Sequence, residues 1–78
     1  MVIHVRYFAS LQEQMGQPEQ EISADGILTV KDVWECVSDK PLPESILYAV
    51  NMDYAESATQ VKDGDEVAFF PPVTGGAI

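Results

Sequence analysis

The principal helix of this chain is predicted from the stretch Thr29-Val30-Lys31-Asp32-Val33-Trp34-Glu35-Cys36-Val37. Its apolar residues recur at i, i+3, i+4 and i+7, a spacing that places them on one helical face. These residues are Val30, Val33, Trp34 and Val37. Thr29 and Asp32 have the spacing of a capping box, and Leu28 and Val33 have that of a hydrophobic staple. A capped helix with one apolar face predicts packing across a single sheet.

A strand, a short helix and a second strand are expected before this helix. Residues 2–8 are rich in β-branched and aromatic side chains with an alternating pattern, which predicts a half-buried strand. The residues on its apolar face are Ile3, Val5 and Tyr7. Ser10 and Glu13 have the spacing of another capping box, and Gly16 supplies a helix stop. Residues 19–23 form a weaker strand candidate, the hairpin partner of the first strand.

Strand segments dominate after the principal helix, which Lys40-Pro41-Leu42-Pro43 ends. Residues 46–50 have strand-like composition, Asn51-Met52-Asp53 interrupts them, and residues 66–70 form the last strand. The order is strand, short helix, strand, helix, then two or three strands. It predicts an α+β fold in which one principal helix covers a mixed sheet of four or five strands.

Length and charge limit the classes of function. A chain of 78 residues predicts one domain, placed at residues 1–72 and followed by a flexible tail at 73–78. The 13 acidic and 4 basic residues give a net charge of −9, which argues against nucleic acid and anionic membranes as partners. The charge suits a basic protein partner, and solubility alone is an equal explanation.

The expected location is the cytoplasm. Cys36 is the one cysteine, which excludes an internal disulfide and fits a reducing compartment. The sequence contains no recognisable signal peptide and no apolar run of roughly 18 residues that would span a membrane.

The sequence contains no complete catalytic or metal-binding set of residues. We expect His4, the one histidine, to be structural or solvent-facing, and Cys36 to be a small buried hydrophobe. Asp63-Gly64-Asp65-Glu66 lacks the ligand spacing of a calcium loop and is interpreted as a turn. A Gly-rich phosphate loop is also missing. We therefore expect no bound metal or cofactor.

The segment after the last strand reads Pro71-Pro72-Val73-Thr74-Gly75-Gly76. The prolines end sheet pairing and fix φ, so the chain should leave the sheet stiffly. Residues 73–76 would extend roughly 13 Å, and the two glycines could enter a channel that side chains would block. Such an arm suits delivery of a terminal carboxylate to another protein. A frayed terminus is the alternative, although it has no need of a proline-stiffened exit.

The C-terminal residues also resemble a known family. Asp63-Gly64-Asp65-Glu66-Val67-Ala68-Phe69-Phe70-Pro71-Pro72-Val73-Thr74-Gly75-Gly76 resembles the C-terminal signature of the small subunit of molybdopterin synthase. Val5-Arg6-Tyr7-Phe8-Ala9-Ser10 is similar to the first strand and turn of that family, and Ala49-Val50-Asn51 to its central strand. The resemblance implies a ubiquitin-like β-grasp fold and a sulfur carrier.

The resemblance also implies a reaction sequence and a set of partners. In that family an ATP-dependent activating enzyme adenylates the terminal glycine carboxylate, and sulfur from a persulfide protein converts it to a thiocarboxylate. The charged subunit then inserts its tail into the large, catalytic subunit and donates sulfur to cyclic pyranopterin monophosphate, forming the dithiolene of molybdopterin. By this resemblance the carrier is a non-catalytic sulfur donor in a heterotetramer, binds no cofactor itself, and leaves ATP to the activating enzyme.

The alternation of the last strand identifies an interface. Val67 and Phe69 should face the core, which leaves Ala68 and Phe70 on the opposite face. An outward Phe70 beside two prolines would form an exposed apolar patch, a common mark of an interface. We therefore expect Phe70 to anchor both the activating enzyme and the large subunit.

The resemblance implies that Gly76 is the reacting residue and that the tail before it enters the partner. Phe8 and Tyr54 are further interface candidates, and for Tyr54 a structural role is an equal alternative. The full set of expected partner contacts is Phe8, Tyr54, Ala68, Phe70, Pro71, Pro72, Val73, Thr74 and Gly75.

The chain departs from the family pattern at Ala77-Ile78, because Gly76 is the last residue of the family's active form. These two residues hold the required carboxylate in a peptide bond, so we expect a protease to remove them. One alternative is a sulfur carrier for another pathway, such as thiamine thiazole formation or tRNA thiolation. Another is a ubiquitin-like interaction module that cannot be charged.

Overall fold

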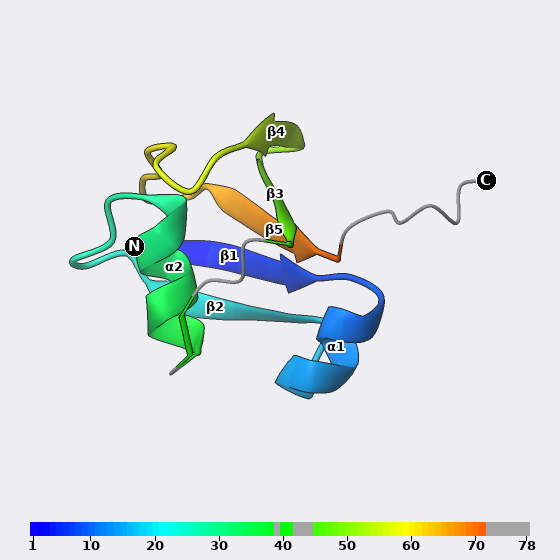
Figure 1. The fold of residues 1–78 in the computed structure, drawn as a ribbon. Helices are drawn as coiled ribbons and strands as arrows, with labels where there is room; N and C mark the ends of the chain where they lie inside the picture. Colours follow the sequence, from blue (N-terminus) through cyan, green and yellow to red (C-terminus); the bar gives the residue numbers. More distant parts are fainter. Residues whose placement is uncertain (39, 42–44, 72–78) are drawn as a thin grey trace.

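A five-stranded mixed sheet, with a helix packed on one face, forms the centre of the computed structural model (Figure 1). The structure describes residues 1–38, 40–41 and 45–71. Its elements are β1 (Val2–Tyr7), α1 (Ser10–Met15), β2 (Glu19–Ser23), α2 (Val30–Val37), β3 (Leu47–Val50), β4 (Asp53–Ala55) and β5 (Glu66–Phe70). The strand order is β2-β1-β5-β3-β4, which confirms the predicted element order and mixed sheet.

The pairing brings the two ends of the described chain together. β1 pairs with β5 in parallel, and the other neighbouring strands are antiparallel. The weak strand candidate at residues 19–23 pairs with β1 as predicted, with Ile22 opposite Ile3. β1 and β5 are both central strands. Their side chains on one face of the sheet are covered by α2, and those on the opposite face are not.

The helix α2 begins as its sequence predicts. Thr29 is the N-cap, and its Oγ1 accepts a hydrogen bond of 3.3 Å from the backbone N–H of Asp32. Asp32 in turn accepts from the backbone N–H groups of Leu28 (2.9 Å) and Thr29 (3.1 Å), which completes the capping box. The hydrogen bond from Leu28, followed by those from Thr29, lowers the pKa of the Asp32 carboxyl.

No helix among the described residues is long and apolar enough to cross a membrane.

The core lies between α2 and the sheet, with Phe69 at its centre. The Phe69 ring is fully buried and packs against three other aromatic rings. Its centroid lies 5.2 Å from that of Trp34, 6.0 Å from that of Tyr48 and 6.3 Å from that of Tyr7. The predicted apolar stripe of α2 faces this cluster, with Val30, Val33 and Trp34 buried and Val37 partly buried.

Two predictions about residues around α2 are wrong. Cys36 is exposed rather than buried, because it lies two residues after Trp34, roughly 200° around a helix of 3.6 residues per turn. Leu28 is 70% exposed while Val33 is fully buried, so they do not form the predicted buried staple. The backbone of Leu28 is used instead, since its carbonyl accepts from Val61 and its N–H donates to Asp32.

The capping box predicted for α1 is also wrong. The N-cap is Ala9, which has no side-chain capping bond, and Ser10 is already the first helical residue. Ala9 has φ 54° and ψ −131°, and the N–H of Leu11 donates to the carbonyl of Phe8 at 3.1 Å. This geometry resembles the first central position of a type II′ turn, a position that favours glycine. The predicted helix stop is confirmed, because Gly16 is the left-handed C-cap.

Replacing Ala9 with glycine is therefore expected to stabilise the protein. Strain at a positive φ costs of order 1–3 kcal/mol, whereas the greater freedom of glycine in the unfolded chain costs about 0.5–1 kcal/mol. We expect Ala9→Gly to raise the free energy of unfolding by about 1 kcal/mol. Urea unfolding measures the change, and Ala24→Gly, at a partly buried position with no positive φ, should destabilise. A loss of stability in Ala9→Gly would contradict the expectation.

Candidate functional site

The face of the sheet opposite α2 carries an apolar groove. In β5, Val67 and Phe69 point into the core, as predicted, and Ala68 and Phe70 lie on the other face. The strand register aligns Arg6, Ala68, Ala49 and Tyr54 in one row across four strands. Ala68 and Ala49, at the centre of this row, have small side chains and form the floor of the groove. The larger side chains around them form its walls.

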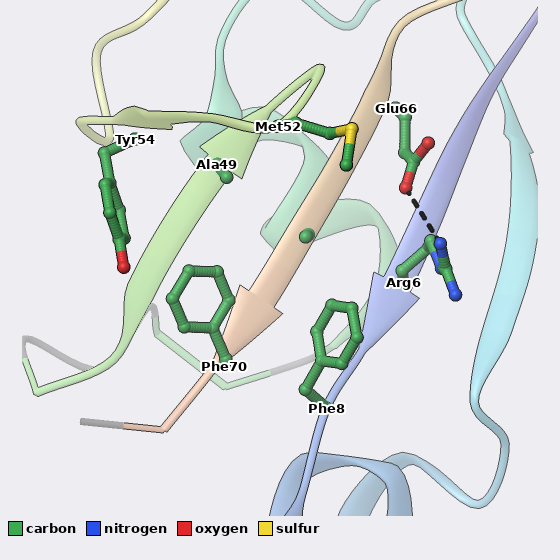
Figure 2. A pocket seen from close by; sticks show the side chains of 8 residues that line it. Arg6, Phe8, Ala49, Met52, Tyr54, Glu66 and Phe70 are labelled. Carbon is green, nitrogen blue, oxygen red and sulfur yellow. Dashed lines mark hydrogen bonds and ion pairs between the residues drawn. The ribbon is translucent and has the colours of Figure 1, made fainter. Parts of the chain in front are cut away.

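This groove has a volume of about 290 Å³ and is drawn in Figure 2. Its lining residues are Arg6, Phe8, Ala49, Met52, Tyr54, Glu66, Ala68 and Phe70. They come from β1, β3, β4, β5 and the segments next to them, so the groove exists only when these four strands have paired.

Phe70 connects the aromatic side chains of the groove. Its ring centroid lies 6.1 Å from that of Phe8, edge to face, and 5.9 Å from that of Tyr54. Phe8 is 38% exposed and Tyr54 is 79% exposed, so much of their apolar surface stays in contact with water. Large exposed apolar patches on a protein surface often mark the binding site for another protein.

An ion pair limits one end of the groove. Nη1 of Arg6 lies 3.3 Å from Oε2 of Glu66, and the guanidinium carbon lies 5.4 Å from the centre of the Phe8 ring. Both charged side chains are over a third exposed, so the pair contributes little to stability. Its effect is to hold the guanidinium over Phe8 and to neutralise the charge at that end.

The turn between β3 and β4 is fastened to β5 by Asn51. Its backbone N–H donates to the Glu66 carbonyl at 2.8 Å, and its Oδ1 accepts from the Glu66 N–H at 3.0 Å. Its Nδ2 donates to Oδ1 of Asp65 at 3.0 Å. This last bond, with that from the Lys62 N–H, holds the pKa of the buried Asp65 carboxyl below its ordinary value. Asp65 is therefore ionised at neutral pH and fixes the predicted turn at residues 63–66.

The remaining polar residues outside the groove include His4, the one histidine. His4 faces solvent, as expected, with its Nδ1 3.3 Å from Oε2 of Glu21. Among residues 1–38, 40–41 and 45–71, no group of three His, Cys, Asp or Glu side chains could hold a metal ion.

The structure brings together four of the predicted contact residues. Phe8, Tyr54, Ala68 and Phe70 all line the groove, and Pro71 follows directly where β5 leaves the sheet. The other predicted site residues, Pro72, Val73, Thr74, Gly75 and Gly76, lie outside the described residues. The roles of all these residues as partner contacts stay predictions.

Four lining residues were not predicted from the sequence: Arg6, Ala49, Met52 and Glu66. The alternation along β1, β3 and β5 could have identified Arg6, Ala49 and Glu66, because each lies on the same face as Ala68. Met52 gave no such signal, since it lies in a turn rather than in a strand.

The comparison with known families decides where this chain belongs, because the ThiS family model matches residues 5–76. The chain belongs to the ThiS family. Among curated relatives, the molybdopterin synthase sulfur carrier subunit of Escherichia coli is 37% identical over 96% of this chain and 100% of the relative. The subunit of the same name from Chlamydomonas reinhardtii is 35% identical over 97% of this chain and 100% of the relative.

Several solved structures are similar in fold to this ThiS-family chain. The crystal structure of SAMP1 from Haloferax volcanii, a small archaeal modifier protein, has a TM-score of 0.80 at 28% identity and covers 97% of this chain and 100% of that one. The complex of subunits 1 and 2 of molybdopterin-converting factor from Helicobacter pylori matches with a TM-score of 0.67 at 25% identity, covering 97% and 100%. These likenesses confirm the predicted ubiquitin-like β-grasp fold and the predicted family resemblance.

Proposed function

We propose that this ThiS-family chain is the sulfur carrier subunit of molybdopterin synthase, and that its groove binds the large, catalytic subunit. The observation that carries the proposal is the position of the groove. Phe70 forms its central aromatic side chain and Pro71 begins the exit from the sheet. A partner seated on the groove would therefore lie next to the start of the segment that contains Gly75-Gly76.

The proposed chemistry takes place at the carboxylate of Gly76. A free carboxylate is a poor acyl electrophile, so an activating enzyme would use ATP to attach AMP as a leaving group. The terminal sulfur of a persulfide-bearing protein would displace AMP and form an acyl disulfide, and a thiol would then cleave its S–S bond to leave the thiocarboxylate and a disulfide on the donor side. That sulfur is an ionised, soft nucleophile, and the large subunit would direct it to cyclic pyranopterin monophosphate, so that two charged carriers in turn supply the two sulfurs of the molybdopterin dithiolene.

The charge of the chain supports proteins as its partners. The net charge of −9 favours encounter with basic protein surfaces and disfavours nucleic acid. The groove itself is apolar with a neutralised end, so the docked contact would depend on packing while the wider field would assist association.

The proposal requires a free carboxylate at Gly76, which in this sequence is followed by Ala77-Ile78. We therefore propose that a protease cleaves the peptide bond after Gly76 before the carrier is charged.

Intact-mass measurement of the protein isolated from cells that make molybdopterin tests this proposal. The expected species ends at Gly76, and a second species differs from it by exchange of one oxygen for sulfur. Cells lacking the activating enzyme provide the control, because only the uncharged species should remain there. A chain that keeps Ala77-Ile78 while molybdopterin is being made would contradict the proposal.

Co-purification decides between pathways. A carrier for molybdopterin should be recovered with the molybdopterin synthase large subunit, whereas a carrier for thiamine thiazole or tRNA thiolation should not. The likeness to the Haloferax volcanii modifier protein favours conjugation to other proteins as a second candidate function. That function would appear as larger covalent species on a denaturing gel.

A further inference from the structure

Met52 occupies a backbone position that suits glycine. Val50 pairs with Asp53, so Asn51 and Met52 form a two-residue hairpin loop between β3 and β4. Both have positive φ, 52° at Asn51 and 73° at Met52. This is the pattern of a type I′ turn, for which Asn-Gly is a preferred sequence. A side chain with a Cβ at the second position is strained there.

The surrounding structure holds this strained turn in place. The three hydrogen bonds of Asn51 attach it to Glu66 and Asp65 at the start of β5. Strained backbone persists where neighbouring contacts fix it, and it is concentrated at functional sites. The attachment also fixes the backbone of the turn that carries Met52 relative to β5.

The Met52 side chain contributes almost nothing to the packing of the folded chain. Its side chain is 90% exposed, so it buries almost no apolar surface. It nevertheless lines the groove, and Figure 2 shows it reaching from the turn across β5 toward Glu66. When a residue is strained in its backbone conformation and gains no packing in return, a functional role such as binding is indicated.

We propose that Met52 is a specificity-determining contact of the groove, and that its thioether closes over an aromatic side chain of the large subunit. The proposal rests on the function proposed above and names the chemistry that the groove accepts. The alanine floor at Ala49 and Ala68 leaves room for a large side chain between the walls. Phe70 and Tyr54 offer aromatic edges, and a methionine sulfur packs favourably against aromatic rings.

The charges of the groove agree with an apolar occupant. Arg6 and Glu66 are already paired with each other, so neither presents an unopposed charge to the occupant. The groove also includes Phe70, the last residue of β5, which directly precedes Pro71. An aromatic side chain seated here would therefore hold the partner beside the tail that it must receive.

The decisive variant is Met52→Gly, because stability and binding should change in opposite directions. Removing the strained side chain is expected to raise Tm by about 4 °C. Loss of the apolar Met52 side chain is expected to lower affinity for purified molybdopterin synthase large subunit about tenfold by calorimetry. Met52→Leu should keep affinity within about threefold, since volume-conserving apolar exchanges are well tolerated. Leu28→Ala is the matched control, because Leu28 is 70% exposed and does not line the groove.

A second measurement tests the aromatic occupant directly. With methyl-labelled methionine, the Met52 methyl resonance is expected to move upfield when the large subunit is added, because it would lie over a ring. Met1, which is 84% exposed, and Met15, which packs against the core, are internal controls and should not move. An unshifted Met52 resonance in a complex that has formed would overturn the proposal.

The remaining outcomes are equally decisive. Unchanged affinity of Met52→Gly, in a series where Phe70→Ala weakens binding, would overturn the role of Met52 and leave the proposed function intact. A fall in both Tm and affinity would assign Met52 to the turn and overturn the inference. No binding of the unaltered, matured chain to the large subunit would overturn the proposed function and this inference with it.

Discussion

Phe70→Ala is expected to weaken binding of the matured chain to the molybdopterin synthase large subunit about 100-fold, since central aromatic anchors contribute 2 kcal/mol or more. Phe70 is the side chain that both Phe8 and Tyr54 contact. Its removal would therefore take away an anchor and separate the remaining aromatic walls. Titration calorimetry with the purified large subunit measures the effect.

The fold should tolerate this substitution. The Phe70 ring lies on the uncovered face of the sheet and is outside the core cluster, so we expect a cost in stability of about 1 kcal/mol, the range of aromatic pair contacts. Leu28→Ala is the control, because Leu28 is 70% exposed and does not line the groove. Equal affinities of Phe70→Ala and the unaltered chain would remove Phe70 from the interface.

Phe69→Ala, one residue earlier, is expected to act mainly on stability, whereas Phe70→Ala acts mainly on affinity. Its ring is fully buried against Trp34, Tyr48 and Tyr7, and large-to-small changes of a buried phenylalanine cost about 3–5 kcal/mol. Domains are commonly stable by 5–15 kcal/mol, and small ones lie at the low end. The variant should therefore lose most of its stability in urea unfolding.

Phe69→Leu separates the loss of packing volume from the loss of the aromatic ring. Leucine fills much of the same space, so we expect a cost of about 1–2 kcal/mol, between that of a tolerated exchange and that of alanine. A loss below about 1 kcal/mol in Phe69→Ala would contradict the central position assigned to this ring.

The elements of the fold were predictable because their signals are local. The spacing of Val30, Val33 and Trp34 describes a helix with one buried face, and the capping pair of Thr29 and Asp32 marks its start. The errors at Ser10 and Cys36 have local causes as well. At Ser10 the capping spacing was assigned one residue late, because Ala9 takes the N-cap position. At Cys36 the cause is its position roughly 200° around the helix from Trp34, which places it outside the apolar stripe.

The groove was predictable only in part, because it depends on strand register. Alternation in the sequence places Phe70 outward, but it does not show that Phe8 and Tyr54 come within reach of the same ring. Register also aligns Ala49 with Ala68 to make the low floor. Met52 could not be predicted at all, because its importance lies in a backbone conformation that its residue type disfavours.

The parallel pairing of β1 with β5 has a consequence for how the protein is made. His4 lies opposite Glu66, so the middle of the sheet cannot close until the ribosome has released nearly all of the chain described here. At 5–20 residues per second, β1 waits roughly 3 to 14 s for its neighbour. Until then the docking groove does not exist. A partly translated chain therefore lacks the proposed docking surface, which forms together with the strand that precedes the Gly75-Gly76 segment.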